Sequence, residues 1–195
     1  CEALALLSGD GRLTIVGSPA VVTTKGVRTT ASNIQLHQAE NRLWIDGEGQ
    51  MAFFPAPPEK PAGRILYQNE SLLPAAQPET PDMIVSWNHR LDFDGQRARF
   101  GQDVQVRGKI RQENGEVFRW LAMGNALDVV LVRRLRFAAT DDQPKPEIDR
   151  VVFSGSVFME GTTTLAEQQL SQDQFRLNNL TLSQFRDQQP QRLHG

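Results

Sequence analysis

The chain has 195 residues, which is enough for one large domain or two small ones with a substantial core. Its 21 basic and 23 acidic residues exclude the strongly positive charge that is typical of nucleic-acid-binding domains. A single cysteine excludes an internal disulfide framework and a cysteine-based zinc site, and no apolar run reaches the roughly 18 residues of a membrane-spanning helix.

The only cysteine is the first residue, Cys1. One interpretation is the lipidated first residue of a mature lipoprotein, and the other is a fragment boundary. A strand-like pattern follows the cysteine without a flexible tether, which favours the boundary. The last residues, 192–195, resemble Arg12-Leu13 leading to Gly17. We therefore expect the chain to be a fragment of a longer repetitive protein.

The first block, residues 1–54, contains a repeat at an offset of 30. Apolar or glycine pairs keep one register together with Arg12/Arg42: Leu4/Ile34, Leu6/Leu36, Leu13/Leu43, Ile15/Ile45 and Gly17/Gly47. Apolar residues alternate with period 2 inside each copy, which predicts β-strands with one apolar face. Each copy is therefore expected to be a β-hairpin, the first turning at 8–11, and Gly47-Glu48-Gly49 is expected to be a bend or bulge.

The next segment, residues 55–82, is rich in proline. Seven of the eleven prolines of the chain lie between Pro55 and Pro81. Proline lacks the N–H that a β-ladder needs, so this segment is predicted to be an extended loop or linker.

Residues 83–195 are predicted to hold the second and third β blocks of the same stack. Asp94-Gly95 and Asn114-Gly115 are typical of hairpin turns in which both residues tolerate positive φ. A second repeat, at an offset of 53, relates three identical pairs: Phe100/Phe153, Val104/Val157 and Leu127/Leu180. Helical periodicity is weak throughout, and the ambiguous stretch 118–123 is predicted to be a strand. The sequence therefore predicts an all-β fold of stacked antiparallel hairpins.

Motifs for catalysis or metal binding are nearly absent. The three histidines, His37, His89 and His194, do not have the spacing of metal ligands, and neither a nucleophile elbow nor a phosphate-binding loop occurs. Asp92 and Asp94 lie near His89 in a combination that could bind a metal, but polar residues flanking a turn are the favoured interpretation. We therefore predict a protein that is not an enzyme and uses no cofactor.

The order of strand and glycine motifs resembles a known family. The motifs are Leu13–Gly17 with Pro19-Ala20 and Val22, Ala31–Leu36, Asn41–Gly47, Phe93–Val106 and Val151–Val157. Together they resemble the OstA-like family, the β-jellyroll or β-taco domains of lipopolysaccharide-transport proteins. The resemblance implies a folded-over pair of antiparallel sheets, or elongated open sandwich, whose inner apolar groove shelters acyl chains during transit across the periplasm.

The resemblance also implies partners and a location. Lipid or lipopolysaccharide-like cargo is expected in the groove, and neighbouring β-jellyroll domains are expected at the edge strands. The expected location is the periplasm or the periplasmic face of the outer membrane. The inward-facing groove candidates are Leu13, Ile15, Leu43, Ile45, Val104, Val106, Leu127, Val129, Val157, Met159, Leu180 and Leu182.

Two alternatives use the same strand pattern. In the first, the chain is a purely structural β-stalk or interaction scaffold, and the groove candidates fill a closed core. In the second, it is a carbohydrate-active enzyme or another enzyme on a β-solenoid, for which Asp92, Asp94 and Asp103 are the only candidate carboxylates.

Overall fold

The computed structural model describes residues 4–9, 11–24, 27–54, 80–137, 147–166 and 168–183. Cys1, most of the proline-rich segment, His194 and the C-terminal residues 192–195 lie outside these ranges. The described strands are β1 (Leu4–Leu7), β2 (Arg12–Thr24), β3 (Val27–His37), β4 (Arg42–Asp46), β5 (Gly49–Phe53), β6 (Met83–Trp87), β7 (Arg90–Phe93), β8 (Arg97–Arg111), β9 (Val117–Leu131), β10 (Ile148–Leu165) and β11 (Gln168–Ser183). The described ranges contain no helix, so none that is long and apolar enough to cross a membrane. The all-β prediction is confirmed.

All eleven strands belong to one antiparallel sheet, with the order β1-β2-β3-β4-β7-β8-β9-β10-β11. The short strands β4 and β5 follow each other along β3, while β6 and β7 follow each other along β8. The pairs β4–β7 and β5–β6 join the block before the proline-rich segment to the block after it. The blocks on either side of that segment therefore form one continuous sheet.

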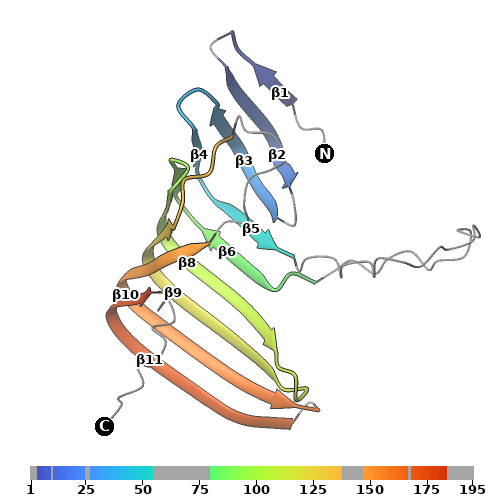
Figure 1. Ribbon diagram of the computed structural model, residues 1–195, viewed down its shortest axis with the longest axis vertical. Coiled ribbons are helices and arrows are strands. Elements are labelled where there is room, and N and C mark those ends of the chain that lie inside the picture. Colours follow the sequence, from blue (N-terminus) through green and yellow to red (C-terminus); the bar gives the residue numbers. More distant parts are fainter. Residues whose placement is uncertain are drawn as a thin grey trace, which may run out of the picture.

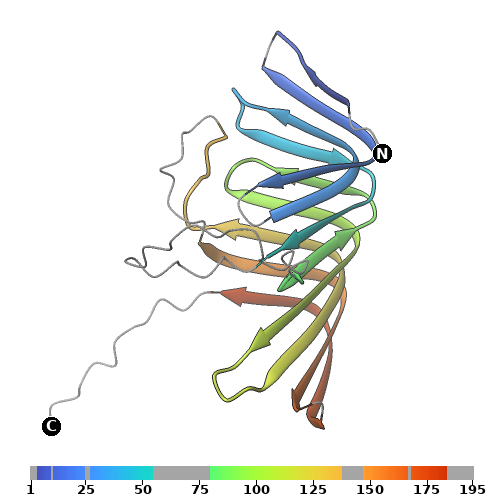
Figure 2. The ribbon, with the colours of Figure 1, turned by 90° about the vertical axis from the view of Figure 1, so that its right-hand side faces the viewer.

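The sheet is folded over along a crease that crosses the strands near their midpoints (Figures 1 and 2). We call the part that contains β4 and β7 the first arm, and the part that contains β5 and β6 the second arm. At the crease the register shifts between Val16 and Ala20 in β2 and between Gly101 and Val104 in β8. Gly47 separates β4 from β5 with a φ of +98°, which confirms the predicted bend. The structure is a stack of antiparallel hairpins folded into a taco-like jellyroll.

The inner face of the first arm consists of two continuous apolar rows. Successive register pairs give one row of Leu13, Leu36, Leu43, Phe93, Ala98, Val129, Val151 and Leu182. The second row contains Ile15, Ile34, Ile45, Leu91, Phe100, Leu127, Phe153 and Leu180. Side chains alternate between the two faces of a strand, so the period-2 pattern of the sequence places both rows on the same side.

The offset of 53 corresponds to one hairpin of this stack. Phe100, Leu127, Phe153 and Leu180 follow one another across β8, β9, β10 and β11 in a single row. The backbone repeats as well, because Gln102-Asp103 and the equivalent Gly155-Ser156 all have positive φ at the crease. The two halves of this repeat therefore occupy equivalent places.

The offset of 30 holds for β2 and β4 but not for β1. Ile15 and Ile45 lie in the same row, whereas the β1 residues opposite Leu13 and Ile15 are Leu7 and Ala5. The expected partners, Leu6 and Leu4, are displaced by one position. The cause is the length of the turn. Residues 8–12, five in number, separate the pair Leu7/Leu13, whereas only the four residues 38–41 separate the pair His37/Arg42. One extra residue in the turn shifts the pairing by one position.

The two predicted hairpin turns are present, but only their glycines have positive φ, at +91° for Gly95 and +86° for Gly115. Asp94 acts through its side chain instead, and its Oδ1 accepts hydrogen bonds from the backbone N–H groups of Gln96 (2.9 Å) and Arg97 (2.8 Å). Asn114 Oδ1 accepts one from the N–H of Glu116. The expectation that both residues of each pair take positive φ was wrong, because these side chains stabilise the turns by bonding to the backbone.

Candidate functional site

The predicted groove residues divide into three groups by burial. Five lie in the fully buried core: Ile45, Val104, Val106, Leu127 and Val157. Five are partly buried and pack against that core: Ile15, Leu43, Val129, Met159 and Leu180. Leu13 is half-buried, while Leu182 is 50% exposed. The inner face is therefore closed in the middle of the stack and open toward its C-terminal end.

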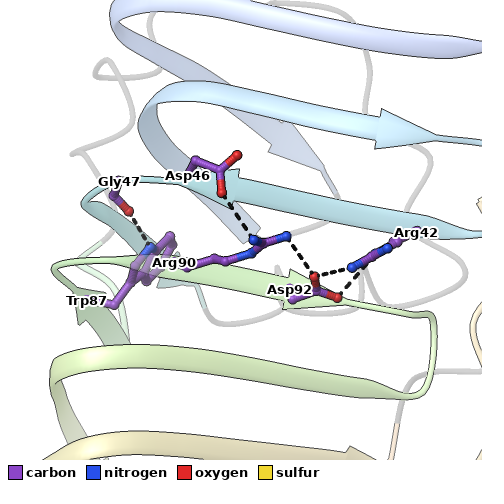
Figure 3. A network of polar contacts seen from close by, with 6 residues as sticks. All are labelled: Arg42, Asp46, Gly47, Trp87, Arg90 and Asp92. Carbon is purple, nitrogen blue, oxygen red and sulfur yellow. Dashed lines mark hydrogen bonds and ion pairs between the residues drawn. The ribbon is translucent and has the colours of Figure 1, made fainter.

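Trp87 closes the middle of the stack. Its side chain is 1% exposed, and its Nε1–H donates a hydrogen bond to the carbonyl of Gly47 at 3.1 Å (Figure 3). The ring packs against Phe100, with centroids 5.3 Å apart, and lies over Gly49, the residue directly across the strand pair. A Cβ at Gly49 would overlap the indole ring. This glycine is required for the close approach of the tryptophan to the backbone.

The second arm contains a similar packing of a tryptophan on glycine. Trp120 is paired with Gly108 on one side and with Gly161 on the other. A Cβ at Gly108 would overlap the Trp120 ring, and a Cβ at Gly161 would lie 2.8 Å from Phe118. The rings thus lie against glycines of the neighbouring strands, and Trp120 is partly buried against the core.

The inner face is exposed to solvent at β11, the strand at the far end of the stack in Figure 1. Phe175, Leu177 and Leu182 are paired with Met159, Val157 and Val151 of β10, so they face the same side as the core. They are nevertheless 55%, 43% and 50% exposed. In the sheet order of the described strands nothing follows β11. A terminal strand that only faced water would favour polar residues at these positions.

A short segment, residues 132–137, covers the rim of the first arm. Asn41 holds it with both ends of its side-chain amide, since Nδ2 donates to the carbonyl of Leu135 (2.6 Å) and Oδ1 accepts from the N–H of Phe137 (2.7 Å). The Phe137 ring packs edge-on against Phe93, at a centroid distance of 5.8 Å. The hydrogen bond between Asn41 and Phe137 joins residues that are 96 positions apart in sequence. No pattern in the sequence predicted it.

The outer face of the first arm carries a ladder of ion pairs (Figure 3). Asp92 accepts from Arg42 Nη2 at 2.6 Å and from Arg90 Nη2 at 3.2 Å, and Arg90 Nη1 also lies 3.6 Å from Asp46. The hydrogen bond and charge of Asp92 raise the pKa of Arg42. Arg97 and Arg99 similarly flank Asp128, at 2.7 and 3.5 Å. These ion pairs bring opposite charges of neighbouring strands together on this face.

The three candidate catalytic carboxylates each bind a different part of the structure and do not form one group. Asp92 belongs to the ladder, Asp94 bonds to its turn, and Asp103 accepts a hydrogen bond from Asn88 Nδ2 at the crease. His89 is exposed, and its backbone pairs with Gly47 and Gly101. Over the described ranges, no three His, Cys, Asp or Glu side chains form a group that could hold a metal ion. The favoured interpretation of Asp94 as a turn residue agrees with this geometry.

Asp94 predicts a dependence of stability on pH. Desolvation of Asp94 acts to raise its pKa, but the hydrogen bonds from the Arg97 and Gln96 backbone, together with the charges of Arg134 and Arg99, outweigh it, and the pKa is lowered. A lowered folded-state pKa means that stability is fully present above the ordinary value of about 3.9 and is lost as the pH falls through the folded-state pKa. We expect Asp94→Asn to be less stable than the unaltered chain at pH 6, with a difference that shrinks below pH 4. Urea unfolding at both pH values measures this, and a constant difference would contradict it.

The sequence identified Leu182 and Leu180 on β11 but missed Phe175 and Leu177. The signal was present as alternation on either side of Asn178-Asn179, and it was hidden because the register shift at the crease changes the phase of the alternation. Comparisons with protein-family models, with curated proteins and with solved structures find no match to this chain.

Proposed function

We propose that this protein binds the acyl chains of lipids along the inner face of its folded sheet, as a non-enzymatic component of envelope biogenesis. The observation that carries the proposal is the apolar row of β11. Phe175, Leu177 and Leu182 continue the inner face of the core into solvent, where nothing in the described structure covers them. Exposed apolar patches that continue a core are typical of sites that bind apolar ligands or partners.

The proposed setting follows from the resemblance to OstA-like domains. In that setting the cargo is a lipopolysaccharide-like lipid, the location is the periplasm or the periplasmic face of the outer membrane, and neighbouring jellyroll domains pair with the edge strands. The taco-like fold and the unpaired edge of β11 among the described strands support these assignments. Leu7 of β1, which is 75% exposed beside Leu13, provides a second apolar position at the opposite edge.

A structural scaffold is the alternative that a specific observation favours. Trp87, Val104, Val157 and Leu127 are at most 2% exposed, so the middle of the stack leaves no room for an acyl chain. Lipid binding is therefore proposed for the open end at β11 and not for the buried core.

Site-specific photo-crosslinking tests the proposal. A photoreactive phenylalanine analogue is placed at the inward positions Phe175 and Leu177, and at the outward controls Gln174 and Thr181 of the same strand. After irradiation with lipopolysaccharide dispersions, the mass of the protein reports captured lipid. We expect several-fold more capture at the inward positions than at the controls.

Equal capture at inward and outward positions would contradict lipid binding along the inner face. Capture at background level at all four positions would favour the scaffold.

A further inference from the structure

The crease contains an open hollow between β9, β10 and β11. It has a volume of about 770 Å³, and Met123, Val157, Phe158, Arg176 and Leu177 are among its lining residues. The strand register shifts on both sides of β10 at this point, and Gly155 and Ser156 have φ values of +75° and +53°. The hollow lies where regular strand pairing is interrupted on both sides of one strand.

The lining contains residues from both faces of the sheet. Val157 and Leu177 are a register pair on the inner face, whereas the adjacent pair, Phe158 and Arg176, faces outward. The Arg176 guanidinium lies over the Phe158 ring at 5.7 Å from the centroid. No carboxylate of the described residues lies within ion-pair distance of Arg176. Among the described residues, the hollow thus places a cation without an ion-pair partner next to Leu177, an exposed apolar residue of the inner face.

The internal repeat shows that this combination is special to the last hairpin. At the offset of 53, Arg176 corresponds to Met123 and Leu177 corresponds to Gly124. Gly124 is buried, and a Cβ there would already contact Phe153 and Val157. At this position β9, which is paired on both sides, has a methionine and a glycine. The equivalent position of β11, the last of the described strands in the sheet, has an arginine and a leucine. Stacking alone does not require a cation at this position.

We propose that this hollow receives the phosphate-bearing end of an acyl amphiphile, with the phosphate bound by Arg176 and the acyl chain lying over the exposed side chain of Leu177. The inference rests on the proposed function and adds to it the residue that recognises the headgroup. A guanidinium is suited to phosphate because it donates two parallel hydrogen bonds and keeps its charge at all relevant pH values. Leu177, at 43% exposure, provides the adjoining apolar surface.

Calorimetric titration of the whole chain separates headgroup recognition from acyl binding. The probes are dodecyl phosphate and the neutral dodecyl maltoside, each below its critical micelle concentration, and inorganic phosphate alone. We expect Arg176→Gln to weaken dodecyl phosphate binding about tenfold, the effect of one charge-assisted hydrogen-bonding group, and to leave maltoside binding unchanged. Leu177→Asn should weaken both amphiphiles.

Arg119→Gln is the matched control, because Arg119 is another exposed arginine on the outer face of the second arm and donates to Thr164 Oγ1. Its amphiphile binding should equal that of the unaltered chain. An equal loss of dodecyl phosphate affinity in both arginine variants would mean that only the net charge of the protein matters, and it would overturn the assignment. Binding of inorganic phosphate as tight as that of dodecyl phosphate would also overturn it, in favour of a simple anion site.

The outcomes also distinguish this inference from the proposed function. If Arg176→Gln binds dodecyl phosphate as tightly as the unaltered chain does, the headgroup assignment is wrong and acyl binding stands. If neither amphiphile binds and the chain self-associates through β11 in sedimentation experiments, strand pairing covers this edge and both proposals fail.

Discussion

Trp87→Ala is expected to lower the free energy of unfolding by about 3–5 kcal/mol, the usual cost of truncating a fully buried tryptophan. The loss combines the apolar surface of a ring that is 1% exposed, its contact with Phe100, and the hydrogen bond that Nε1 donates to Gly47. Because Gly49 has no side chain, it cannot fill the space that the ring leaves, and a cavity results. Urea unfolding followed by far-UV circular dichroism measures the change without relying on tryptophan fluorescence.

Trp44→Ala is the matched control for that experiment. Trp44 lies on the outer face, where Arg12 and Arg42 approach its ring at 5.9 and 5.8 Å. Truncating it removes cation–π contacts and part-buried surface, at an expected cost of about 1 kcal/mol. If both variants lost the same stability, Trp87 would not seal the core as described. Trp87→Phe keeps a smaller aromatic ring without the indole N–H, and its loss of stability should fall between those of the two alanine variants. This keeps the test interpretable if Trp87→Ala does not fold.

Gly95→Ala is expected to cost about 3 kcal/mol, from the left-handed backbone of this residue and from steric overlap. Gly95 is buried at φ +91°, and an added Cβ would overlap the side-chain amide of Asn41 and lie 2.7 Å from the carbonyl of Leu135. The overlap should displace segment 132–137 from the rim of the first arm. Hydrogen exchange reports this directly, because the N–H of Leu135 bonds to Gly95 and that of Phe137 bonds to Asn41.

Gly115→Ala separates backbone strain from overlap. Gly115 has a similar φ of +86° in the next hairpin turn, but the nearest atom to an added Cβ is 3.8 Å away, on Leu165. We expect a loss of about 1 kcal/mol and unchanged exchange at Leu135 and Phe137. Equal losses for the two alanine variants would show that segment 132–137 does not depend on the space at Gly95.

The strands and their apolar faces were largely predictable from residue order. Leu13/Ile15, Leu43/Ile45 and Leu127/Val129 alternate with period 2, and an extended chain turns successive side chains to opposite faces whatever lies around it. The glycines at 47 and 95 likewise indicated a bend and a turn, since their positive φ is a local property of the backbone. The offset of 53 relates β8 to β10 and β9 to β11, which occupy equivalent places in the stack.

The burial of individual inner side chains was not predictable from local sequence. Ile45 and Leu182 follow the same alternation, but Ile45 is buried and Leu182 is 50% exposed. Their difference comes from the position of each strand in the sheet: β4 lies between β3 and β7, whereas among the described strands β11 has a neighbour only on the side of β10. The clamp of Asn41 on residues 135 and 137, and the meeting of Arg176 with Phe158 beside the register shift, likewise depend on long-range pairing. Residue order assigned the face of most inner side chains, since that depends only on the pleat, and the stacking of distant hairpins assigned their exposure, since burial requires a neighbour from elsewhere in the chain.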